Sequence, residues 1–319
     1  MKITILVDDV WKFNKHVDEY LVRSNHKVTF IDSSIIKFKY KNKFQKITNF
    51  ISKTFFGNNI KKDFVNKTII SKIQNLQQQD YILIINPDVY RTDIVNLLKT
   101  KTKKYIAHNY DSLDRHPLPQ NYQFLFDKVF TFDIEDAKNN NDLYLLNNFI
   151  YTNKEVNLKP QNKFFMILSK SFEREILLNK IADILDKKTN CNYEFLVLYP
   201  DYQNHNTNIQ LLDKPISLKE MEEKVKNAEI LIDLVRTNQS GLSFRFFEAM
   251  AFEKKIITNN KYVKEFDFYN SSNILVLDDD FNDIDNEFLN TPYVPVPEEI
   301  YNRYTLQNWV NTVFNLKNN

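Results

Sequence analysis

The chain has 319 residues, with 43 Lys and Arg against 41 Asp and Glu, one Cys, two Gly and nine Pro. At roughly 100 to 200 residues per domain this length predicts two domains, and a hydrophobic share of 43 % excludes a wholly disordered chain. Apolar runs such as residues 81–85 are much shorter than the ~20 residues of a membrane-spanning helix, and the acids at positions 8 and 9 interrupt any signal peptide. The single Cys191 excludes an internal disulfide and fits the reducing cytoplasm.

The N-terminal half alternates short apolar runs with helical patterns. Strands are expected at 3–7, 27–32, 81–85, 104–108 and 128–132, and helices at 12–24, 64–78 and 91–99. Strands that are separated by helices predict right-handed crossovers and a parallel sheet. We therefore expect residues 1–155 to form a doubly wound α/β domain.

A basic segment, residues 33–67, interrupts this domain. It has nine Lys and one acid, Asp63, which gives it a charge of 9 − 1 = +8 and leaves 2 − 8 = −6 for the rest of the chain. Seven aromatic residues lie among the lysines, a composition that favours a phosphate-bearing lipid, a bilayer surface or, least of all because Arg is absent, nucleic acid. The predicted anion or acceptor surface is Lys37, Lys39, Lys41 and Lys43. The alternative is a helical insertion whose aromatics pack inward and whose lysines are merely solvated.

A second alternating series follows a polar stretch near residues 152–163. Its expected strands are 164–168, 193–198, 229–235, 255–258 and 273–277, and its expected helices are 172–187, 217–228 and 242–253. Ser217 and Glu220 form a capping box that marks the start of the second helix. The series predicts a second α/β domain at 156–296, and residues 297–319 read as a helical segment that packs back on the N-terminal domain.

Residues 229–259 are the most informative stretch. A buried strand is followed by the loop RTNQSG and by a helix from about Leu242, so the amides near Gly241 are expected to receive a phosphate. Along the helix, residues 244, 247 and 251 are expected to face the sheet. Glu248 could accept hydrogen bonds from two sugar hydroxyls, and Arg236 or Arg245 could neutralise a phosphate. The alternative for Arg245 and Glu248 is an i,i+3 surface ion pair.

The run from Val235 to Asp278 carries NQSGL, RxFEA, KKIIT and DFYN in order, and it resembles the donor-binding region of GT-B glycosyltransferases. It looks most like the CgeB-type and lipopolysaccharide-biosynthesis proteins. FFMILSKSFERE at 164–175 and, in the first half, INPD, HNYDS and KVFTFDIEDAK extend the resemblance. The resemblance implies a GT-B fold, in which two Rossmann-like domains face a central cleft.

The resemblance also implies a transferase that moves sugar from a nucleotide-sugar to a glycan or lipid-linked acceptor in bacterial lipopolysaccharide, O-antigen or capsule synthesis. Glu248 would then bind the ribose, while Ser240 stands where related enzymes carry a second glutamate. The implied donor-binding residues are Arg236, Asn238, Gln239, Ser240, Gly241, Leu242, Arg245 and Glu248. We expect neither metal nor cofactor, because basic side chains and a helix dipole can stabilise the leaving phosphate.

The predicted general base lies at the carboxyl ends of the first domain's strands. The candidates are His108, Asp111 and Asp9, with Asp8 as a competitor of Asp9. These features favour a cytoplasmic enzyme with possible peripheral contact to the inner membrane. We expect no nucleic-acid partner.

Three alternatives stay open. A metal-dependent GT-A transferase would use the aspartates at 278–285, although a solvated acidic loop is the simpler reading. A receiver domain would need a phosphoacceptor where Asn86 stands. The third alternative is a GT-B-like protein that binds sugar or lipid without catalysis.

Overall fold

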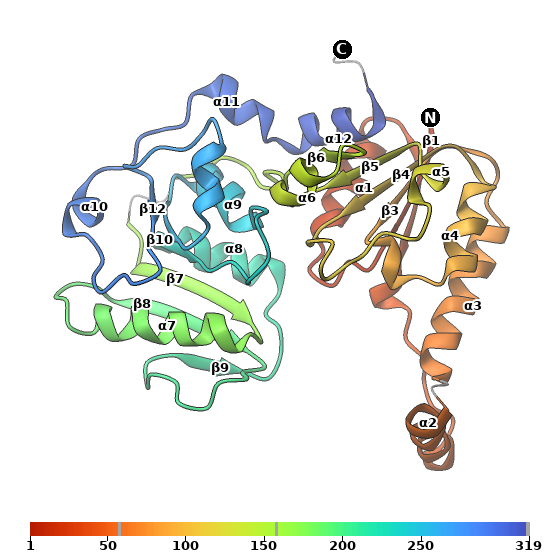
Figure 1. Ribbon diagram of the computed structural model, residues 1–319, viewed down its shortest axis with the longest axis horizontal. Coiled ribbons are helices and arrows are strands. Elements are labelled where there is room, and N and C mark those ends of the chain that lie inside the picture. The colour runs from red at the N-terminus through yellow and green to blue at the C-terminus, as the bar shows by residue number, and fades with distance from the viewer. Residues whose placement is uncertain (57–58, 157–158, 317–319) are drawn as a thin grey trace. The chain divides into compact units, whose positions relative to one another are not determined.

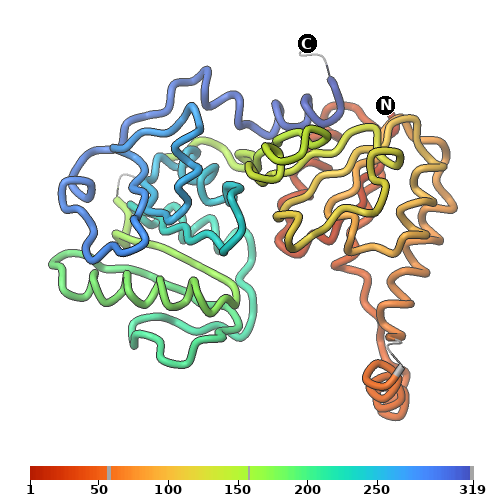
Figure 2. Tube along the Cα trace, viewed as in Figure 1, coloured from red at the N-terminus to blue at the C-terminus, as the bar shows by residue number. Residues whose placement is uncertain are grey.

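The computed structural model describes residues 1–56, 59–156 and 159–316 (Figure 1). The predicted insertion, linker and terminal segment therefore each include residues outside this description, namely 57–58, 157–158 and 317–319. The chain divides into two compact units, which the tube in Figure 2 traces from red to blue. The first unit holds Met1–Phe132, Asp136–Leu145 and, near the C-terminus, residues 313–316, and the second holds Asp133–Glu135 and Leu146–Thr312. The chain thus enters the second unit earlier than the predicted boundary at residue 156.

The first unit is a parallel six-stranded sheet of order β2-β1-β3-β4-β5-β6. Its elements along the chain are β1 (Lys2–Val7), α1 (Phe13–Arg23), β2 (Lys27–Asp32), η1 (Ser33–Ile35), α2 (Lys43–Phe56), α3 (Ile60–Gln74), β3 (Gln79–Ile85), η2 (Pro87–Val89), α4 (Thr92–Lys99), β4 (Thr102–Asn109), α5 (Tyr122–Leu125), β5 (Lys128–Thr131), α6 (Ile134–Asn139) and β6 (Leu143–Leu145).

The core of this unit joins the sheet to α3 and α4. Ile82 and Ile84 of β3 pack with Ile69 of α3 and with Ile94 and Leu98 of α4, and all five side chains are fully buried. Strands that are covered on both faces need nearly continuous apolar sequence, which explains runs such as YILII.

The second unit is also a parallel six-stranded sheet, of order β12-β11-β10-β7-β8-β9. Its elements are β7 (Asn162–Ser169), α7 (Phe172–Leu185), β8 (Tyr193–Leu198), β9 (Gln210–Leu212), α8 (Leu218–Lys226), β10 (Ala228–Asp233), α9 (Phe244–Phe252), β11 (Lys255–Thr258), η3 (Lys261–Glu265), β12 (Ile274–Val276), α10 (Asn286–Asn290), α11 (Glu298–Arg303) and α12 (Leu306–Phe314).

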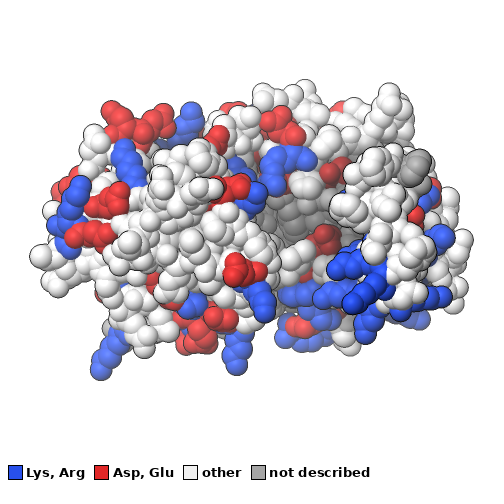
Figure 3. All heavy atoms as spheres, turned by 90° about the horizontal axis from the view of Figure 1, so that it is seen from below, with Lys and Arg blue, Asp and Glu red and all other residues white. Residues whose placement is uncertain are grey.

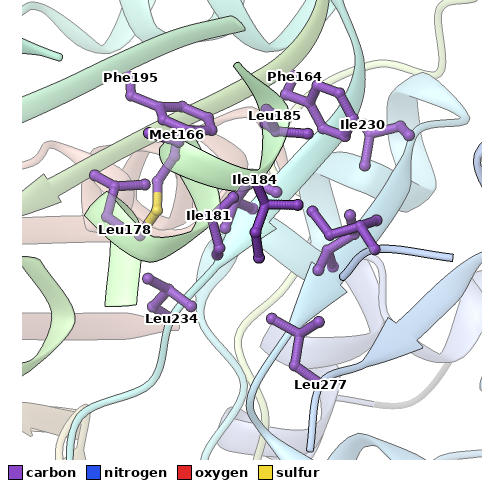
Figure 4. Packing of buried hydrophobic residues seen from close by; sticks show 14 of the residues in the cluster. Phe164, Met166, Leu178, Ile181, Ile184, Leu185, Phe195, Ile230, Leu234 and Leu277 are labelled. Carbon is purple, nitrogen blue, oxygen red and sulfur yellow. The ribbon is translucent and has the colours of Figure 1, made fainter. Parts of the chain in front are cut away.

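Two hydrophobic cores cover the two faces of this second sheet. Phe164 and Met166 of β7 point to the α7 face, where they meet Leu178 and Ile181 (Figure 4). The intervening Phe165 points to the other face, in the core with the helices α8 and α9. This alternation follows from the two-residue period of a strand, and each fully buried aromatic side chain contributes about 2 kcal/mol. The sheet is therefore covered on both faces, which confirms a doubly wound domain.

The predicted elements appear with shifted ends. α3 begins at Ile60 rather than at residue 64, and α9 begins at Phe244 rather than near Leu242. The start of α8 is confirmed, because the Ser217 hydroxyl accepts a hydrogen bond from the Glu220 amide at 3.2 Å. Of the residues predicted to face the sheet, Phe247 and Ala251 are confirmed in the core, whereas Phe244 is half-buried. Every residue from Phe246 to Phe252 is buried, so α9 is covered on more than this one face.

The C-terminal segment forms the helix pair α11 and α12. Val313 and Phe314 at the end of α12 belong to the first unit, where the Phe314 ring meets the Tyr81 ring of β3 edge to face at 5.7 Å. Within residues 1–56, 59–156 and 159–316, no helix has the length and apolar character needed to cross a membrane.

Candidate functional site

The second sheet changes direction of winding at β7. The chain leaves β7 through α7 to β8 on one side and later returns through α8 to β10 on the other side of β7. Open α/β sheets bind ligands at the carboxyl ends of two such strands, where the crossovers diverge to opposite faces. The carboxyl ends of β7 and β10 are therefore the place to look for a ligand site.

Three cationic side chains lie at these strand ends. The Arg174 guanidinium donates to the carbonyl of Ser169 at 2.9 Å and to that of Leu234 at 3.4 Å, so it bridges the ends of β7 and β10. Arg236 donates to the carbonyl of Lys170 at 3.1 Å, and the exposed Lys170 is the third cation. Arginine forks and a lysine at a strand-end crevice suit a phosphate group. Arg236 was among the predicted residues, whereas Arg174 and Lys170 were not.

A buried carboxylate holds the loop that faces Lys170. Glu175 is fully buried and accepts hydrogen bonds from the amides of Asp201 at 3.0 Å and Tyr202 at 2.8 Å, and from His205 Nε2 at 3.0 Å. Asp201 in turn pairs with Lys170 Nζ at 2.6 Å. Burial alone would raise the pKa of Glu175, but these hydrogen bonds outweigh it and hold the pKa below its usual value. Glu175 thus holds Asp201, which is the ion-pair partner of the site cation Lys170.

The loop 236–241 is held by Asp133, which belongs to the same unit. Its carboxylate accepts from the amides of Ser240 at 2.7 Å and Gly241 at 3.3 Å, and from the Ser240 hydroxyl at 2.6 Å. Asn260 donates to the carbonyls of Ser240 and Gly241, both at 3.1 Å. The amides near Gly241, which we predicted to bind a phosphate, therefore bind the Asp133 carboxylate of the chain itself. The prediction of a phosphate site at these amides is corrected accordingly.

The other predicted loop residues differ in exposure. Asn238 is exposed and has a positive φ of 59°, and Gln239 is half-buried. Leu242 is a core residue whose carbonyl accepts from Asn148 at 2.9 Å. Ser243 caps α9 by accepting from the Arg245 amide at 3.1 Å, and its hydroxyl donates to the buried Asp233 at 2.6 Å. Burial raises the pKa of Asp233.

Glu248 lies in a buried cluster. One carboxylate oxygen pairs with Arg245 Nη1 at 2.5 Å, and the other accepts from the Tyr151 hydroxyl. The Glu248 side chain is 1 % exposed, and burial raises its pKa. The predicted i,i+3 ion pair of Arg245 and Glu248 is thus confirmed. It is not on the surface, however, because Arg245 packs against the Phe165 ring at 5.7 Å. This cluster joins α9 to the segment before β7.

The candidate bases of the first unit lie in or just after strands of its own sheet. Asp9 is buried after β1, and its carboxylate accepts from the α1 amides of Asn14 at 3.2 Å and Lys15 at 3.0 Å. Burial raises the pKa of Asp9. His108 is fully buried in β4. Asp111 follows β4 and pairs with Arg115, and its side chain is 13 % exposed.

Three of the remaining aspartates considered above have local structural roles. Asp8, which follows β1 and is exposed, accepts from the Ser33 hydroxyl at 3.0 Å. In the acidic stretch at 278–285, Asp283 pairs with Lys188 at 2.7 Å, and Asp285 caps α10 by accepting from the Glu287 amide at 2.8 Å. Within the described residues, no group of three His, Cys, Asp or Glu side chains is placed to hold a metal ion.

A hollow of about 480 Å³ lies at the opposite end of the second sheet. Its lining includes Asn162 and Tyr193 at the amino ends of β7 and β8, and the ion pair of Glu194 with Lys224 at 2.5 Å. Because parallel α/β sheets bind ligands at their carboxyl ends, the cation cluster is the better candidate despite the volume of this hollow.

With two doubly wound parallel sheets in one chain, the protein has the fold of the GT-B glycosyltransferases. An alpha-glucosyltransferase in complex with UDP and a 13-mer DNA containing an HMU base aligns with a TM-score of 0.59 and 14 % identity, over 98 % of this chain and 95 % of that one. An alpha-glucosyltransferase with UDP-glucose and DNA containing an abasic site aligns at 0.58 and 13 %, over 99 % and 93 %. TarM aligns at 0.54 and 11 %, over 79 % and 58 %.

Sequence comparison adds nothing to this similarity of fold. No protein-family model matches the chain, and no curated protein matches it.

Proposed function

We propose that this protein is a glycosyltransferase whose donor is a nucleoside-diphosphate sugar bound at the carboxyl edge of the second sheet. The observation that carries the proposal is the cluster of Arg174, Arg236 and Lys170 at the ends of β7 and β10. The diphosphate would take the place between these cations. The shared fold with UDP-binding alpha-glucosyltransferases supports the same class of donor.

The cations would also assist the chemistry. As the bond between the sugar and the diphosphate breaks, negative charge grows on the leaving oxygen, and cations that are already in place stabilise it without reorganisation. We propose that Arg174 and Arg236 supply this stabilisation, and that transfer proceeds without a metal ion.

Ser240 and Glu248 require separate roles. Ser240 gives both its amide and its hydroxyl hydrogen to Asp133, so we propose that it positions the loop and does not contact the donor sugar. Glu248 remains our candidate for the ribose hydroxyls. Because Tyr151 and Arg245 each engage one of its oxygens, a ribose hydroxyl would replace the Tyr151 hydroxyl.

We propose a glycan or lipid-linked acceptor in bacterial surface-polysaccharide synthesis, with the acceptor on the first unit. Asp111 is the candidate base with a partly exposed carboxylate, whereas His108 is fully buried and Asp9 is held by two helix amides. Duplex DNA is the acceptor to test beside it, because the alpha-glucosyltransferases of similar fold were solved with DNA.

Nucleotide titration tests the donor site. Thermal-shift and calorimetric titrations with UDP, GDP, dTDP, CMP and ADP should show one responding nucleotide, in EDTA as well as with Mg²⁺. Arg236→Gln should weaken its binding at least about tenfold, because a charge-assisted hydrogen bond to phosphate is worth about 1.5–3 kcal/mol. Arg23→Gln, at an exposed arginine of α1, is the matched control and should bind like the wild type.

Two results would contradict the proposal. If no nucleotide binds under either metal condition, the protein is better described as a non-catalytic binding module. If nucleotides bind equally to wild type and Arg236→Gln, the cation cluster is not the diphosphate site. Transfer of labelled sugar to duplex DNA, but not to lipid-linked glycan, would overturn the acceptor class alone.

A further inference from the structure

The helix α2 has its apolar side on the outside. In Figure 1 it lies at the end of the first unit that is remote from the sheet, beyond α3. Phe44, Phe50 and Phe55 are 73 %, 69 % and 75 % exposed, and Ile47 and Ile51 between them are also exposed. At 100° per residue these five side chains fall on one side of the helix. A surface helix of a globular protein normally buries such a face.

The inward side of α2 is polar. Asn49 is buried, and its amide donates to the Tyr40 hydroxyl at 2.8 Å while its carbonyl oxygen accepts from the Ile60 amide at 2.8 Å. Gln45 and Ser52, one helical turn to either side, are half-buried. The orientation of α2 is therefore set by specific hydrogen bonds, and it leaves the apolar side to the surroundings.

The lysines that precede α2 are exposed. From Lys37 to Lys41 the chain alternates, so that Lys37, Lys39 and Lys41 are exposed while Phe38 and Tyr40 turn inward. The Phe38 ring packs edge to face on Tyr40 at 5.3 Å. The alternative in which the aromatic residues pack inward is thus confirmed for Phe38 and Tyr40, but it is wrong for the phenylalanines of α2.

The charge of this region is strongly one-sided, with nine Lys against one acid over residues 33–67. Lys43, Lys46 and Lys53 on α2 are exposed, and Figure 3 shows Lys and Arg side chains gathered at this end of the unit. At 100° per residue Lys43 falls on the apolar side of α2, and Lys46 and Lys53 fall beside it, which gives this side a cationic border.

We propose that α2 is a membrane-interface anchor, which inserts its phenylalanines at the boundary between headgroups and acyl chains of an anionic bilayer. An interfacial helix buries its apolar side about 5–10 Å deep while lysines remain with the anionic headgroups. A second copy of this chain fits less well, because two such borders would bring like charges together. Duplex nucleic acid would match the charge and leave the phenylalanines in water. This proposal does not depend on the proposed transferase activity.

Vesicle flotation tests the anchor on the full chain. The probes are vesicles of phosphatidylcholine alone and vesicles with 30 % phosphatidylglycerol, with duplex DNA as a separate ligand. We expect flotation with the anionic vesicles, and a loss of at least about tenfold in the triple variant Phe44→Ser, Phe50→Ser, Phe55→Ser, because each phenylalanine buries a large apolar area. Phe124→Ser, at an 86 % exposed phenylalanine elsewhere in the unit, should bind like the wild type.

A charge variant tests the second half of the proposal. Lys39→Glu, Lys41→Glu, Lys43→Glu should reduce partitioning by at least about a hundredfold, at roughly fivefold per lysine lost. The matched control changes the exposed Lys187, Lys214 and Lys219 to Glu and should keep most of the binding. Both sets of positions are exposed, and circular dichroism should show unchanged folding.

Four outcomes would overturn the anchor. They are no flotation with anionic vesicles, equal flotation with neutral vesicles, wild-type binding in the phenylalanine variant, and binding of duplex DNA in place of vesicles. A dimer that light scattering detects and that the phenylalanine variant abolishes would instead assign this side to a second copy. Nucleotide binding at Arg236 would be unaffected by any of these results.

Discussion

Replacing Glu175 by glutamine tests whether one buried carboxylate holds the loop beside the cation cluster. Four donors converge on its two oxygens: the amides of Ser171, Asp201 and Tyr202, and His205 Nε2. Glutamine keeps the shape but has one acceptor oxygen, and its NH₂ group would face amide donors. Hydrogen bonds to a charged group contribute about 1.5–3 kcal/mol each, so losing the equivalent of one to two should cost about 3 kcal/mol.

The pH dependence of this loss follows from the sign of the pKa shift. The pKa of Glu175 is below its usual value of 4.5 in the folded protein. Its contribution is therefore complete above pH 4.5 and disappears as the pH falls through the folded-state pKa. The difference in free energy of unfolding between wild type and Glu175→Gln should be largest near pH 7 and should shrink below pH 4.5.

Urea unfolding from pH 3 to 8, with hydrogen exchange of the Asp201 and Tyr202 amides, would measure both effects. Both amides should exchange faster in Glu175→Gln. Glu229→Gln, at an exposed glutamate of β10, is the control and should lie within about 0.5 kcal/mol of the wild type. A loss below 1 kcal/mol, or one that does not change with pH, would refute the role of Glu175.

Three further substitutions test other buried polar groups. Arg245→Met leaves Glu248 buried without its cation and should cost about 3–5 kcal/mol in chemical unfolding; a loss near zero would mean that the pair is not needed. Burial lowers the pKa of Lys254 to about 8, so Lys254→Met should raise the free energy of unfolding at pH 7. This gain in stability should shrink between pH 8 and 10.5, and a gain that does not change with pH would contradict burial as the cause. Asp133→Asn removes an acceptor from the loop 236–241 and should cost about 1–2 kcal/mol, with faster amide exchange in that loop; unchanged exchange would contradict its role.

The sequence predicted the fold well because parallel sheets have long apolar strands. Runs such as FFMIL and YILII, separated by amphipathic helices, identify the central strands, which are buried on both faces. The edge strands β6 and β9 were missed, because each has three residues and is partly exposed. Short edge strands carry too few residues for a two-residue period to appear.

The candidate site was predicted less completely, because its contacts join residues remote in sequence. Asp133 lies 107 residues before Ser240, and nothing near the loop sequence indicates that a carboxylate will occupy its amides. Arg174 lies on a helix that periodicity describes correctly, but its reach to Leu234 follows from the order of β7 and β10 in the sheet. For α2 the sequence left open whether the aromatics point inward or outward, because the periodicity of the two cases is the same, and the buried Asn49 is what turns the apolar side outward.

The central claim is that a nucleoside diphosphate binds at the carboxyl ends of β7 and β10. A crystal structure of the protein with the nucleotide that responds in titration would test it most directly. We predict phosphate oxygens within hydrogen-bond distance of the guanidinium groups of Arg174 and Arg236. A nucleotide in the hollow at the amino ends of β7 and β8, beside Glu194 and Lys224, would contradict the account.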